Sequence, residues 1–407
     1  MRGAGDHLSI GERVAFYRAR RGLTQSVLAN LVGRTEDWLS KIERGEREIR
    51  RLDVLAELAS ALRVSLGDLV GQPVLLEDDH EHDDVPAVRD ALMAPRRLSR
   101  VLFADEQNGR PPDIEQVASL AEGAWEHYQH GRIGRAIDGL PELIRAAQAI
   151  EADRTRGGRG PAVSARIHHL AATTLTKIGE SDLSWIAAER AMNAADDADD
   201  PLALASAARA GTHALLAVGR YDDALQLGQT ARSWLTDHVQ NMDPAALSLL
   251  GMLDLRMATA AARRNDRTTA TELLASADAA AHQLGADANY WQTSFGPTNV
   301  MLHRLSAALD LGDIAFVTEH GPRVDSTVLP TVRQVAHSID LARAYSYSAH
   351  DAEAISALLS AEAKSPQLVR HNPAVREIVR QIHRRTPSTG GRGSEILALA
   401  ERCRAVQ

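Results

Sequence analysis

Five polar side chains between residues 36 and 44 have the types and spacing needed to read the edge of a base pair. On one short predicted helix, the outward-facing positions are Glu36, Asp37, Ser40, Lys41 and Arg44. A lysine ammonium can donate to O6 and N7 of guanine, and a carboxylate can accept from N4 of cytosine. Acids in the first turn also stabilise a helix through its dipole, which is the alternative role for the two acids. In that case specificity depends on the serine, the lysine and the arginine.

Two helices joined by a tight turn must position these side chains. Thr24 can cap the first helix and Thr35 the second, because a threonine hydroxyl accepts from an unpaired amide at a helix start. Gly33 suits the left-handed residue that ends the first helix. Leu39 and Ile42 give the second helix an apolar face at spacing i, i+3. A short capped helix with a polar outer face fits the DNA major groove.

Other side chains near this helix are candidates for DNA contact. Trp38 could touch a thymine methyl group or a sugar, with packing on the domain surface as the alternative. Arginines that contact phosphates add affinity and salt dependence but no sequence choice. The candidates of this kind are Arg18, Arg20, Arg21, Arg34, Arg47, Arg50 and Arg51.

The stretch from about residue 10 to residue 70 resembles the Cro/repressor-type helix-turn-helix family, also called the XRE family. The matching residues include Leu23-Thr24-Gln25, Leu28-Ala29, Gly33, Leu39-Ser40, Ile42-Glu43-Arg44-Gly45, Leu52, Leu55, Leu58-Ala59, Leu62, Val64 and Leu69. The resemblance implies a five-helix, lambda-repressor-like domain that binds double-stranded DNA. It further implies that Gln25, expected to face outward, holds a phosphate. A structural ion pair between Arg18 and Glu43 is implied as well.

Composition favours packed helices in more than one domain. The chain has 407 residues, 44% of them hydrophobic and only 4% aromatic, and alanine is frequent. It shows no run of 18 apolar residues and no apolar leader, so we expect a cytoplasmic protein without a membrane partner. The single cysteine, Cys403, excludes an internal disulfide and a cysteine-based zinc site. No cofactor or metal is expected.

Charge differs between the two parts of the chain. Residues 1–72 hold 12 Lys+Arg and 10 Asp+Glu, whereas the remainder holds 34 and 44. A mildly basic head on an acidic body fits a DNA-reading domain attached to a body that avoids DNA, with chance as the alternative.

Breaks in the helical pattern give the domain organisation. We expect a DNA-binding domain at 1–72, a linker at 73–112 with a short helix near Val88–Leu102, a repeat domain at 113–385, and a terminal loop and capping helix at 386–407. The acidic and histidine run at residues 77–84 could hold a divalent metal, but a solvated linker is the favoured interpretation.

Six similar breaks divide the repeat domain into hairpins. Each has a glycine or a stand-in, then polar residues, then a small or apolar residue. The breaks centre on Gly131, Gly179, Gly219, Asn265, Gly312 and Ala349, at spacings of 48, 40, 46, 47 and 37 residues. The segment from Gly219 to Leu225 resembles the turn of a tetratricopeptide repeat. The predicted fold is therefore all-α, with a tetratricopeptide-like superhelix or, alternatively, a HEAT-like array.

One aromatic segment is the candidate for ligand contact on the inner surface of this array. Large or hydrogen-bonding side chains gather there in a chain otherwise poor in them. The candidates are Tyr290, Trp291, Phe295, Asn299 and His303. Asparagine can pair with a peptide backbone and the aromatic rings offer apolar contact. The alternative is that the two rings at i, i+4 are core residues of a hairpin.

The combination of the two domains is similar to the peptide-responsive, quorum-sensing regulators of Gram-positive bacteria. In that group the repeat domain binds a short peptide and dimerises. The resemblance implies a homodimeric regulator that reads an inverted repeat and responds to a peptide or small-molecule effector. The rival hypothesis is a scaffold that captures a partner protein, with DNA binding secondary. Common catalytic motifs are absent from the sequence, so an enzyme is not expected.

Overall fold

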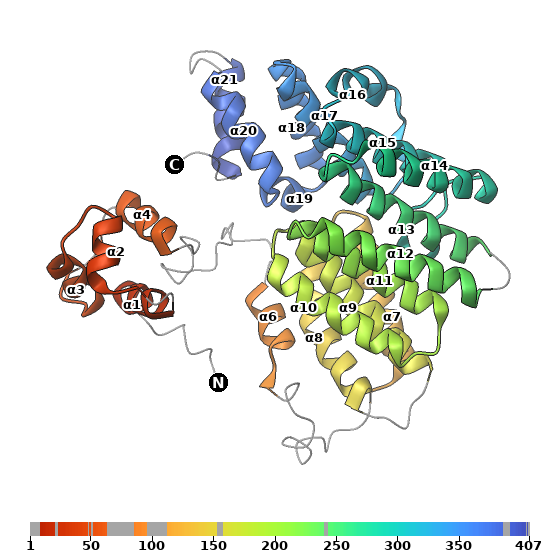
Figure 1. Ribbon diagram of the computed structural model, residues 1–407, viewed down its shortest axis with the longest axis horizontal. Helices are drawn as coiled ribbons and strands as arrows, with labels where there is room; N and C mark the ends of the chain where they lie inside the picture. Colours follow the sequence, from red (N-terminus) through yellow and green to blue (C-terminus); the bar gives the residue numbers. More distant parts are fainter. Residues whose placement is uncertain are drawn as a thin grey trace. The chain divides into compact units, whose positions relative to one another are not determined.

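The chain is described here from a computed structural model, and its described part is all-α, which confirms the predicted fold class (Figure 1). The structure describes residues 9–20, 23–47, 49, 52–62, 85–95, 112–152, 158–239, 243–385, 391–403 and 405. Two compact units are present, Met1–Glu81 and His82–Gln407.

The first unit contains four described helices, α1 (Ile10–Arg20), α2 (Gln25–Leu31), α3 (Glu36–Glu43) and α4 (Leu52–Leu62). Their apolar faces meet in one small core that includes Val14, Leu28, Leu39 and Leu58. Helices α1 and α3 approach closely at Gly11, where an added Cβ would overlap the carbonyl of Ile42. The expected fifth helix falls outside the described residues.

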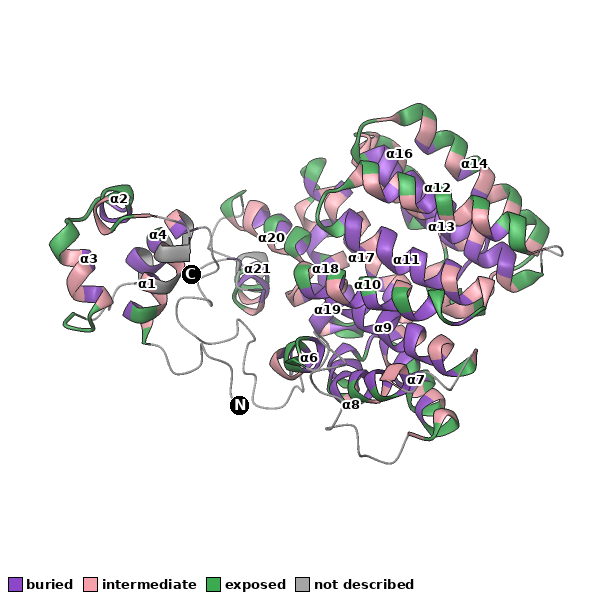
Figure 2. Ribbon diagram, turned by 60° about the horizontal axis from the view of Figure 1, so that its bottom comes forward, coloured by how far each residue is buried: buried purple, intermediate pink, exposed green. Residues whose placement is uncertain are grey.

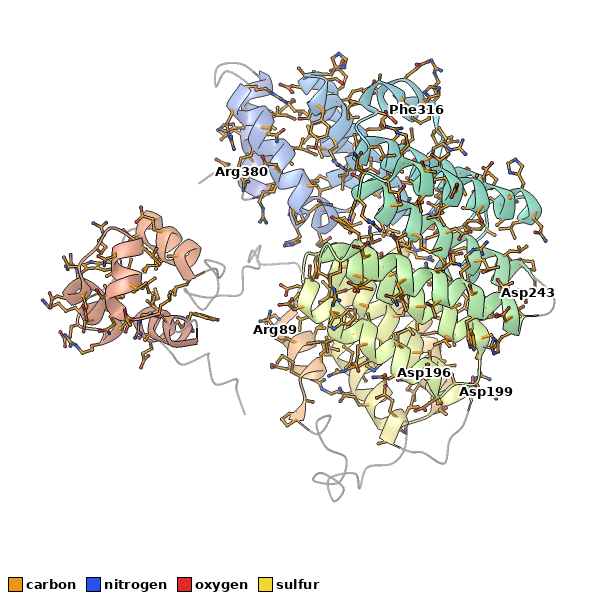
Figure 3. The ribbon with its side chains drawn as sticks, in the orientation of Figure 1. Arg89, Asp196, Asp199, Asp243, Phe316 and Arg380 are labelled. Atoms are coloured by element: carbon orange, nitrogen blue, oxygen red, sulfur yellow. The ribbon has the colours of Figure 1, made fainter. Side chains whose placement is uncertain are left out.

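A short helix begins the second unit. Helix α6 (Val85–Leu92) packs on two helices of the repeat domain, α8 (Ile133–Ala152) and α10 (Ser181–Asp196). Gln148 Nε2 donates to the carbonyl of Ala91 at 2.7 Å, and Arg89, labelled in Figure 3, pairs with Glu180 at 3.4 Å. Helix α6 overlaps the first part of the helix expected near Val88–Leu102, and residues 96–102 lie outside the described residues. It is docked because its apolar face is buried. The acidic and histidine run lies outside the described residues.

Six helical hairpins follow, and they build most of the second unit (Figure 1). Their helices pair as α7 (Ile114–Gln129) with α8, α9 (Arg159–Lys177) with α10, α11 (Pro201–Ala217) with α12 (Tyr221–His238), α13 (Pro244–Arg263) with α14 (Arg267–Leu284), α15 (Pro297–Asp310) with α16 (Ile314–His320), and α17 (Thr331–Tyr347) with α18 (Asp351–Lys364). Three short 3-10 helices lie between hairpins: η3 (Tyr290–Gln292), η4 (Gly321–Arg323) and η5 (Ser326–Val328).

All six predicted breaks are turns between the two helices of a hairpin. Each has a positive φ at its central residue: 74° at Gly131, 86° at Gly179, 75° at Gly219, 60° at Asn265, 85° at Gly312 and 57° at Ala349. Glycine adopts this left-handed conformation at no steric cost, and asparagine tolerates it better than most residues. The alanine at the sixth break, where the sequence pattern is least regular, adopts it with strain.

The first helices of successive hairpins form an inner layer and the second helices an outer layer. Burial follows this arrangement, since α9, α11 and α13 are buried along most of their length (Figure 2). Helix α13 is long and apolar enough to cross a membrane, but its apolar window is 78% buried within the protein. It serves as a core helix of the array.

The two ends of the array meet. Ser365 Oγ donates to the carbonyl of Gly131 at 2.6 Å, across 234 residues of sequence. Helix α17 contacts α7, and α19 (Pro366–Arg370) contacts α8. The sixth hairpin therefore packs against the first, and the inner helices enclose a central space.

Two terminal helices, α20 (Pro373–Arg385) and α21 (Gly391–Arg402), complete the unit. Ile396, Leu399 and Cys403 are fully buried against it. Glu362 on α18 accepts from Arg402 at 2.6 and 2.7 Å and from Arg370 at 2.9 Å. These bonds fix α21 to the last hairpin.

Candidate nucleic-acid interface and ligand cavity

A buried carboxylate joins α1, α2 and α3. Glu43 accepts two bonds from Arg18, at 2.6 and 2.7 Å, and one from Gln25 Nε2 at 2.7 Å. The exposed fractions of the arginine and glutamate side chains are only 17% and 5%. The hydrogen bond from Arg18 to Glu43 raises the pKa of the arginine. The Arg18–Glu43 pair implied by the resemblance is thus present in the geometry.

This cluster corrects two expectations. Gln25 does not point freely outward, because its amide nitrogen is held by Glu43. Arg18 is not a free phosphate ligand either, since its remaining guanidinium nitrogen donates to the carbonyl of Leu23 at 2.9 Å. Arg18 instead joins α1 to α3, and Gln25 joins α2 to α3.

The polar face of α3 is capped and exposed, as the sequence predicts. Thr35 Oγ1 accepts from the amide of Trp38, and Thr24 Oγ1 caps α2 in the same way, both at 3.2 Å. Lys41 Nζ lies 2.7 Å from Asp37 Oδ2, with exposed fractions of 45% and 72%. Such an exposed pair at i, i+4 contributes only about 0.3–0.5 kcal/mol, so a base edge can replace the aspartate. Besides a base contact and stabilisation of the helix start, Asp37 therefore has a third role, the ion pair with Lys41, which the sequence did not predict.

The other candidates around α3 separate into exposed and packed residues. Arg34, Glu36, Arg44 and Arg47 are exposed, and Arg44 pairs with Glu46 at 2.8 Å. Ser40 is half-buried. Trp38 packs against the domain core with the Arg34 guanidinium 5.7 Å from its ring, so the surface-packing alternative describes it. Arg21, Arg50, Arg51 and the side chain of Arg20 lie outside the described residues.

Residues 9–70 match a family described as a helix-turn-helix domain. The N-terminal unit is a helix-turn-helix domain. The immunity repressor protein of Bacillus phage phi105 is 28% identical over 123 residues, which cover 30% of this chain and 84% of the repressor. The helix-turn-helix domain thus has its capped second helix, α3, in the position that contacts DNA bases in such motifs.

Two solved structures align with this chain at low similarity. One is Bacillus thuringiensis PlcR in complex with the peptide PapR7 and DNA, at 13% identity and a TM-score of 0.29, covering 68% of this chain and 95% of that one. The other is the apo form of the competence regulator ComR from Streptococcus vestibularis, at 14% identity and a TM-score of 0.30, covering 74% and 97%. TM-scores this low do not define a shared arrangement.

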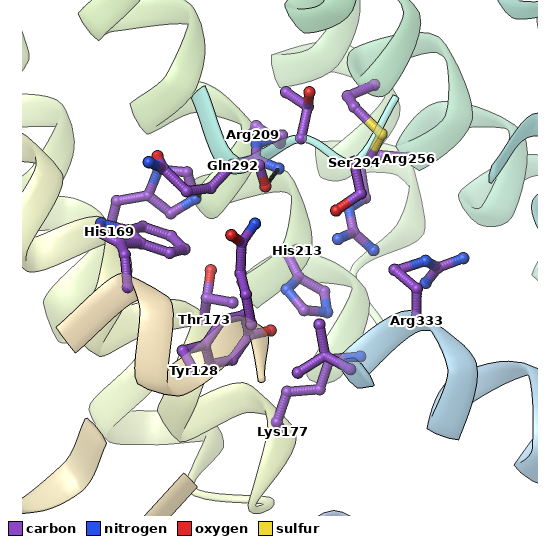
Figure 4. A pocket seen from close by; sticks show the side chains of 15 residues that line it. Tyr128, His169, Thr173, Lys177, Arg209, His213, Arg256, Gln292, Ser294 and Arg333 are labelled. Atoms are coloured by element: carbon purple, nitrogen blue, oxygen red, sulfur yellow. Dashed lines mark hydrogen bonds between the residues drawn. The ribbon is translucent and has the colours of Figure 1, made fainter. Parts of the chain in front are cut away.

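A cavity lies inside the repeat domain, among the inner helices (Figure 4). Its volume is about 40 Å³, and it is partly open to solvent. The lining residues are Trp125, Tyr128 and Gln129 of α7, His169, Thr173 and Lys177 of α9, Arg209 and His213 of α11, Met252 and Arg256 of α13, Gln292, Thr293 and Ser294, and Val332 and Arg333 of α17. Five of the six hairpins therefore contribute to one wall.

The wall is strongly basic. Four cations line it, each from a different inner helix: Lys177, Arg209, Arg256 and Arg333. No aspartate or glutamate is among the lining residues. Burial and nearby arginines lower the pKa of Lys177 to about 7, of Arg256 to about 9 and of Arg209 to about 10. The largest cause of each shift is burial, which disfavours the charged form of the side chain.

A crossover segment, residues 286–296, closes one side of the cavity. Trp291, Gln292 and Ser294 have φ values near 50°, a strained conformation for residues with side chains. Arg209 holds the segment by donating to the carbonyls of Trp291 at 3.1 Å and Gln292 at 3.3 Å. Asn289 exchanges two hydrogen bonds with Gln129 of α7, at 2.9 and 3.0 Å. The segment thus links the fourth hairpin to the first.

The five predicted ligand residues lie in or beside this segment, but none lines the cavity. Phe295 and Asn299 are fully buried. Tyr290 faces solvent, and Trp291 packs with the Arg166 guanidinium 5.2 Å from its ring. His303 is buried and hydrogen-bonds the carbonyl of Asn299 at 3.0 Å.

Phe295 is therefore a core residue, which is the alternative that the sequence left open, and ligand contact at the other four positions stays a prediction. The segment is not a helix, so the i, i+4 spacing of its two rings does not place them on one face. Asn299 Oδ1 accepts from Arg333 Nε at 2.8 Å, so this residue positions a lining arginine from behind the cavity. The neighbouring Gln292, Thr293 and Ser294 form the wall instead.

Lys177 gives the cavity a pH dependence that can be measured. An unfolded lysine titrates near 10.4, so between about pH 7 and pH 10 the unfolded chain binds more protons at this residue than the folded one. Folding stability should therefore rise with pH in this window. The groups that face Lys177 are Arg256, Arg263, Arg333 and Asp340.

Replacing Lys177 with methionine should stabilise the protein at pH 7 by on the order of 1–2 kcal/mol, with the gain shrinking as pH rises. Chemical unfolding at pH 7, 8 and 9 measures it. Lys364→Met is the matched control, because that lysine is exposed and bonds only Gln334. Equal pH profiles for the two variants would contradict the assignment.

Sequence reasoning missed the lining cations, although a signal was present. Each occupies an inner helix near the turn or within an apolar run, such as Arg209 in Ala207-Ala208-Arg209-Ala210-Gly211. A lone charge in such a run is expected to face a cavity or a partner. Predicting that the four cations line one cavity requires knowing that the first and the last hairpin of the array meet.

Proposed function

We propose that this protein is a transcription regulator that reads a specific DNA sequence through α3 and whose repeat domain senses a peptide or small molecule. The capped, exposed α3 within a matched helix-turn-helix domain is the observation that carries the proposal. A homodimer reading an inverted repeat in the cytoplasm is part of it, because paired domains of this kind bind paired half-sites.

In this proposal Lys41 exchanges Asp37 for a base edge on binding. The exposed arginines Arg34 and Arg47 contact phosphates, where they add affinity without sequence choice. Gln25 keeps its predicted phosphate role only through the second N–H of its side-chain amide, because the amide nitrogen already donates one hydrogen bond to Glu43. Base choice then rests on the Ser40 and Lys41 face.

The enclosed cavity supports the sensing part. A ligand there contacts inner helices from five hairpins together with the crossover segment. A molecule that binds more tightly to one arrangement of these hairpins shifts the population toward it. The effector need not contact the DNA-binding unit for such a shift to alter DNA binding.

Selection of random DNA by the full-length chain tests the DNA-reading part. We expect a palindromic site, and Lys41→Ala should relax the choice at one base pair in each half-site, at a cost of about 1–3 kcal/mol. Lys364→Ala, which changes an exposed lysine on α18, is the control. Equal weakening of all sequences would restrict Lys41 to phosphate contact, and the absence of any enriched site would favour the scaffold hypothesis.

A further inference from the structure

The cavity holds several hydrogen-bond donors that the protein itself leaves unpaired. Among the described residues, Arg209 Nε, Arg256 Nε and Trp125 Nε1 are buried without any partner, and so is His213 Nδ1. No described residue accepts a hydrogen bond from the Lys177 ammonium. A buried donor without a partner costs about 1–3 kcal/mol, so this cluster is unfavourable unless something else pairs with it.

The nearby acids compensate these charges only in part, because Asp340 acts on Lys177 and Arg333 but on no other cation of the wall in this way. Asp340 on α17 is buried and interacts with Arg333, but it accepts a hydrogen bond from Ser306 and is not part of the wall. Asp310 is occupied by Arg263 at 3.1 Å and Arg343 at 2.8 Å. The cavity thus keeps an excess of positive charge, and a buried charge is normally paired.

The side chains that carry this charge point into one space from separate helices (Figure 4). Lys177 comes from α9, Arg256 from α13 and Arg333 from α17. Arginine offers a planar fork that matches carboxylate and phosphate oxygens, and lysine adds a point charge. Apolar and aromatic side chains also contribute to the wall, among them Trp125, Met252 and Val332.

We propose that this cavity binds an oxyanionic ligand with at least two negative charges, carried by carboxylate or phosphate groups, through Lys177, Arg256 and Arg333. The proposal deepens the proposed sensing function and rests on it for its biological role, but the binding itself is independent of DNA. Arg209 acts as a positioning residue, because two of its nitrogens hold the crossover segment. The ligand supplies the negative charge that the wall lacks.

Binding of two simple probes to the full-length chain tests the proposal. Citrate represents carboxylates and pyrophosphate represents phosphates, each compared with sodium chloride at the same ionic strength. At millimolar concentration we expect at least one probe to raise the thermal unfolding midpoint by about 2 °C or more, and calorimetric titration to give a saturable isotherm. The stronger probe identifies which oxyanion the cavity prefers.

Variants of the lining residues test whether the probes bind in the cavity. Arg256→Met and Lys177→Met each remove one lining charge and should weaken the stronger probe at least tenfold. Arg145→Met is the matched control, because this arginine is exposed in the middle of α8, away from the cavity. Arg256→Lys should restore part of the affinity by restoring the charge.

Two results would overturn the proposal: no response of the wild-type chain to either probe, or the same response in the two lining variants as in the wild type. The second would place the anions on the outer surface. Because the assay contains no DNA, its failure leaves the DNA-selection result intact. A failed DNA selection likewise leaves the probe isotherms intact.

Discussion

Replacing Glu43 with alanine is expected to destabilise the helix-turn-helix domain by about 3–5 kcal/mol. The substitution removes the acceptor of three hydrogen bonds from Arg18 and Gln25. It leaves a mostly buried guanidinium without its counter-charge, and such an uncompensated charge is far more costly than the loss of an exposed ion pair. Because this cluster joins α1 and α2 to α3, DNA binding should disappear with it.

Hydrogen exchange of the full-length protein measures this effect for α1 to α4 separately from the repeat domain. Glu46→Ala is the matched control, since that glutamate is exposed and pairs only with exposed Arg44. Its cost should stay below about 1 kcal/mol. Similar protection in the two variants would show that the buried cluster does not stabilise the domain.

Phe295→Ala is expected to destabilise the repeat domain by about 3–5 kcal/mol, because this ring takes the core position that the sequence analysis weighed against a ligand contact. The ring is fully buried in the core between α13 and α14. It fills the space left by Gly251, where an added Cβ would overlap the ring. Removing the ring creates a cavity that rigid helices on both sides cannot close.

Denaturant unfolding compares this variant with Tyr290→Ala, which changes a ring that is 47% exposed in the same segment. The control should lose less than about 1 kcal/mol. If Phe295→Ala were as stable as the control and failed only in its response to an effector, the ligand-contact interpretation would be restored.

The turns of the repeat domain could be predicted because they are local. A glycine or its stand-in with positive φ ends a helix by its own backbone preference, whatever the tertiary context. The same holds for Thr24 and Thr35, whose caps lie where the sequence places them. Helix α21 is also recognisable from its own apolar spacing, with Ile396 and Leu399 buried as their pattern indicates.

The sites could be predicted only in part, because they depend on contacts between residues distant in sequence. The bond from Gln25 to Glu43 depends on how α3 crosses α1 and α2, which the helix pattern does not specify. Successive cavity cations are about 30 to 80 residues apart and meet only when the array curves. The segment around Trp291 was selected as a ligand candidate because of its aromatic content. In the structure, these aromatic residues pack in the core or take part in contacts of the crossover segment.

The bond between Ser365 and Gly131 has a consequence for how the repeat domain comes apart. An open row of hairpins can fray from either end, because each hairpin contacts only its neighbours. In a ring the terminal hairpins protect each other, so melting must begin with a break at this seam or at a turn. Deleting the last hairpin therefore removes the contacts that stabilise the first hairpin. A repeat domain shortened in this way should unfold less cooperatively along its whole length.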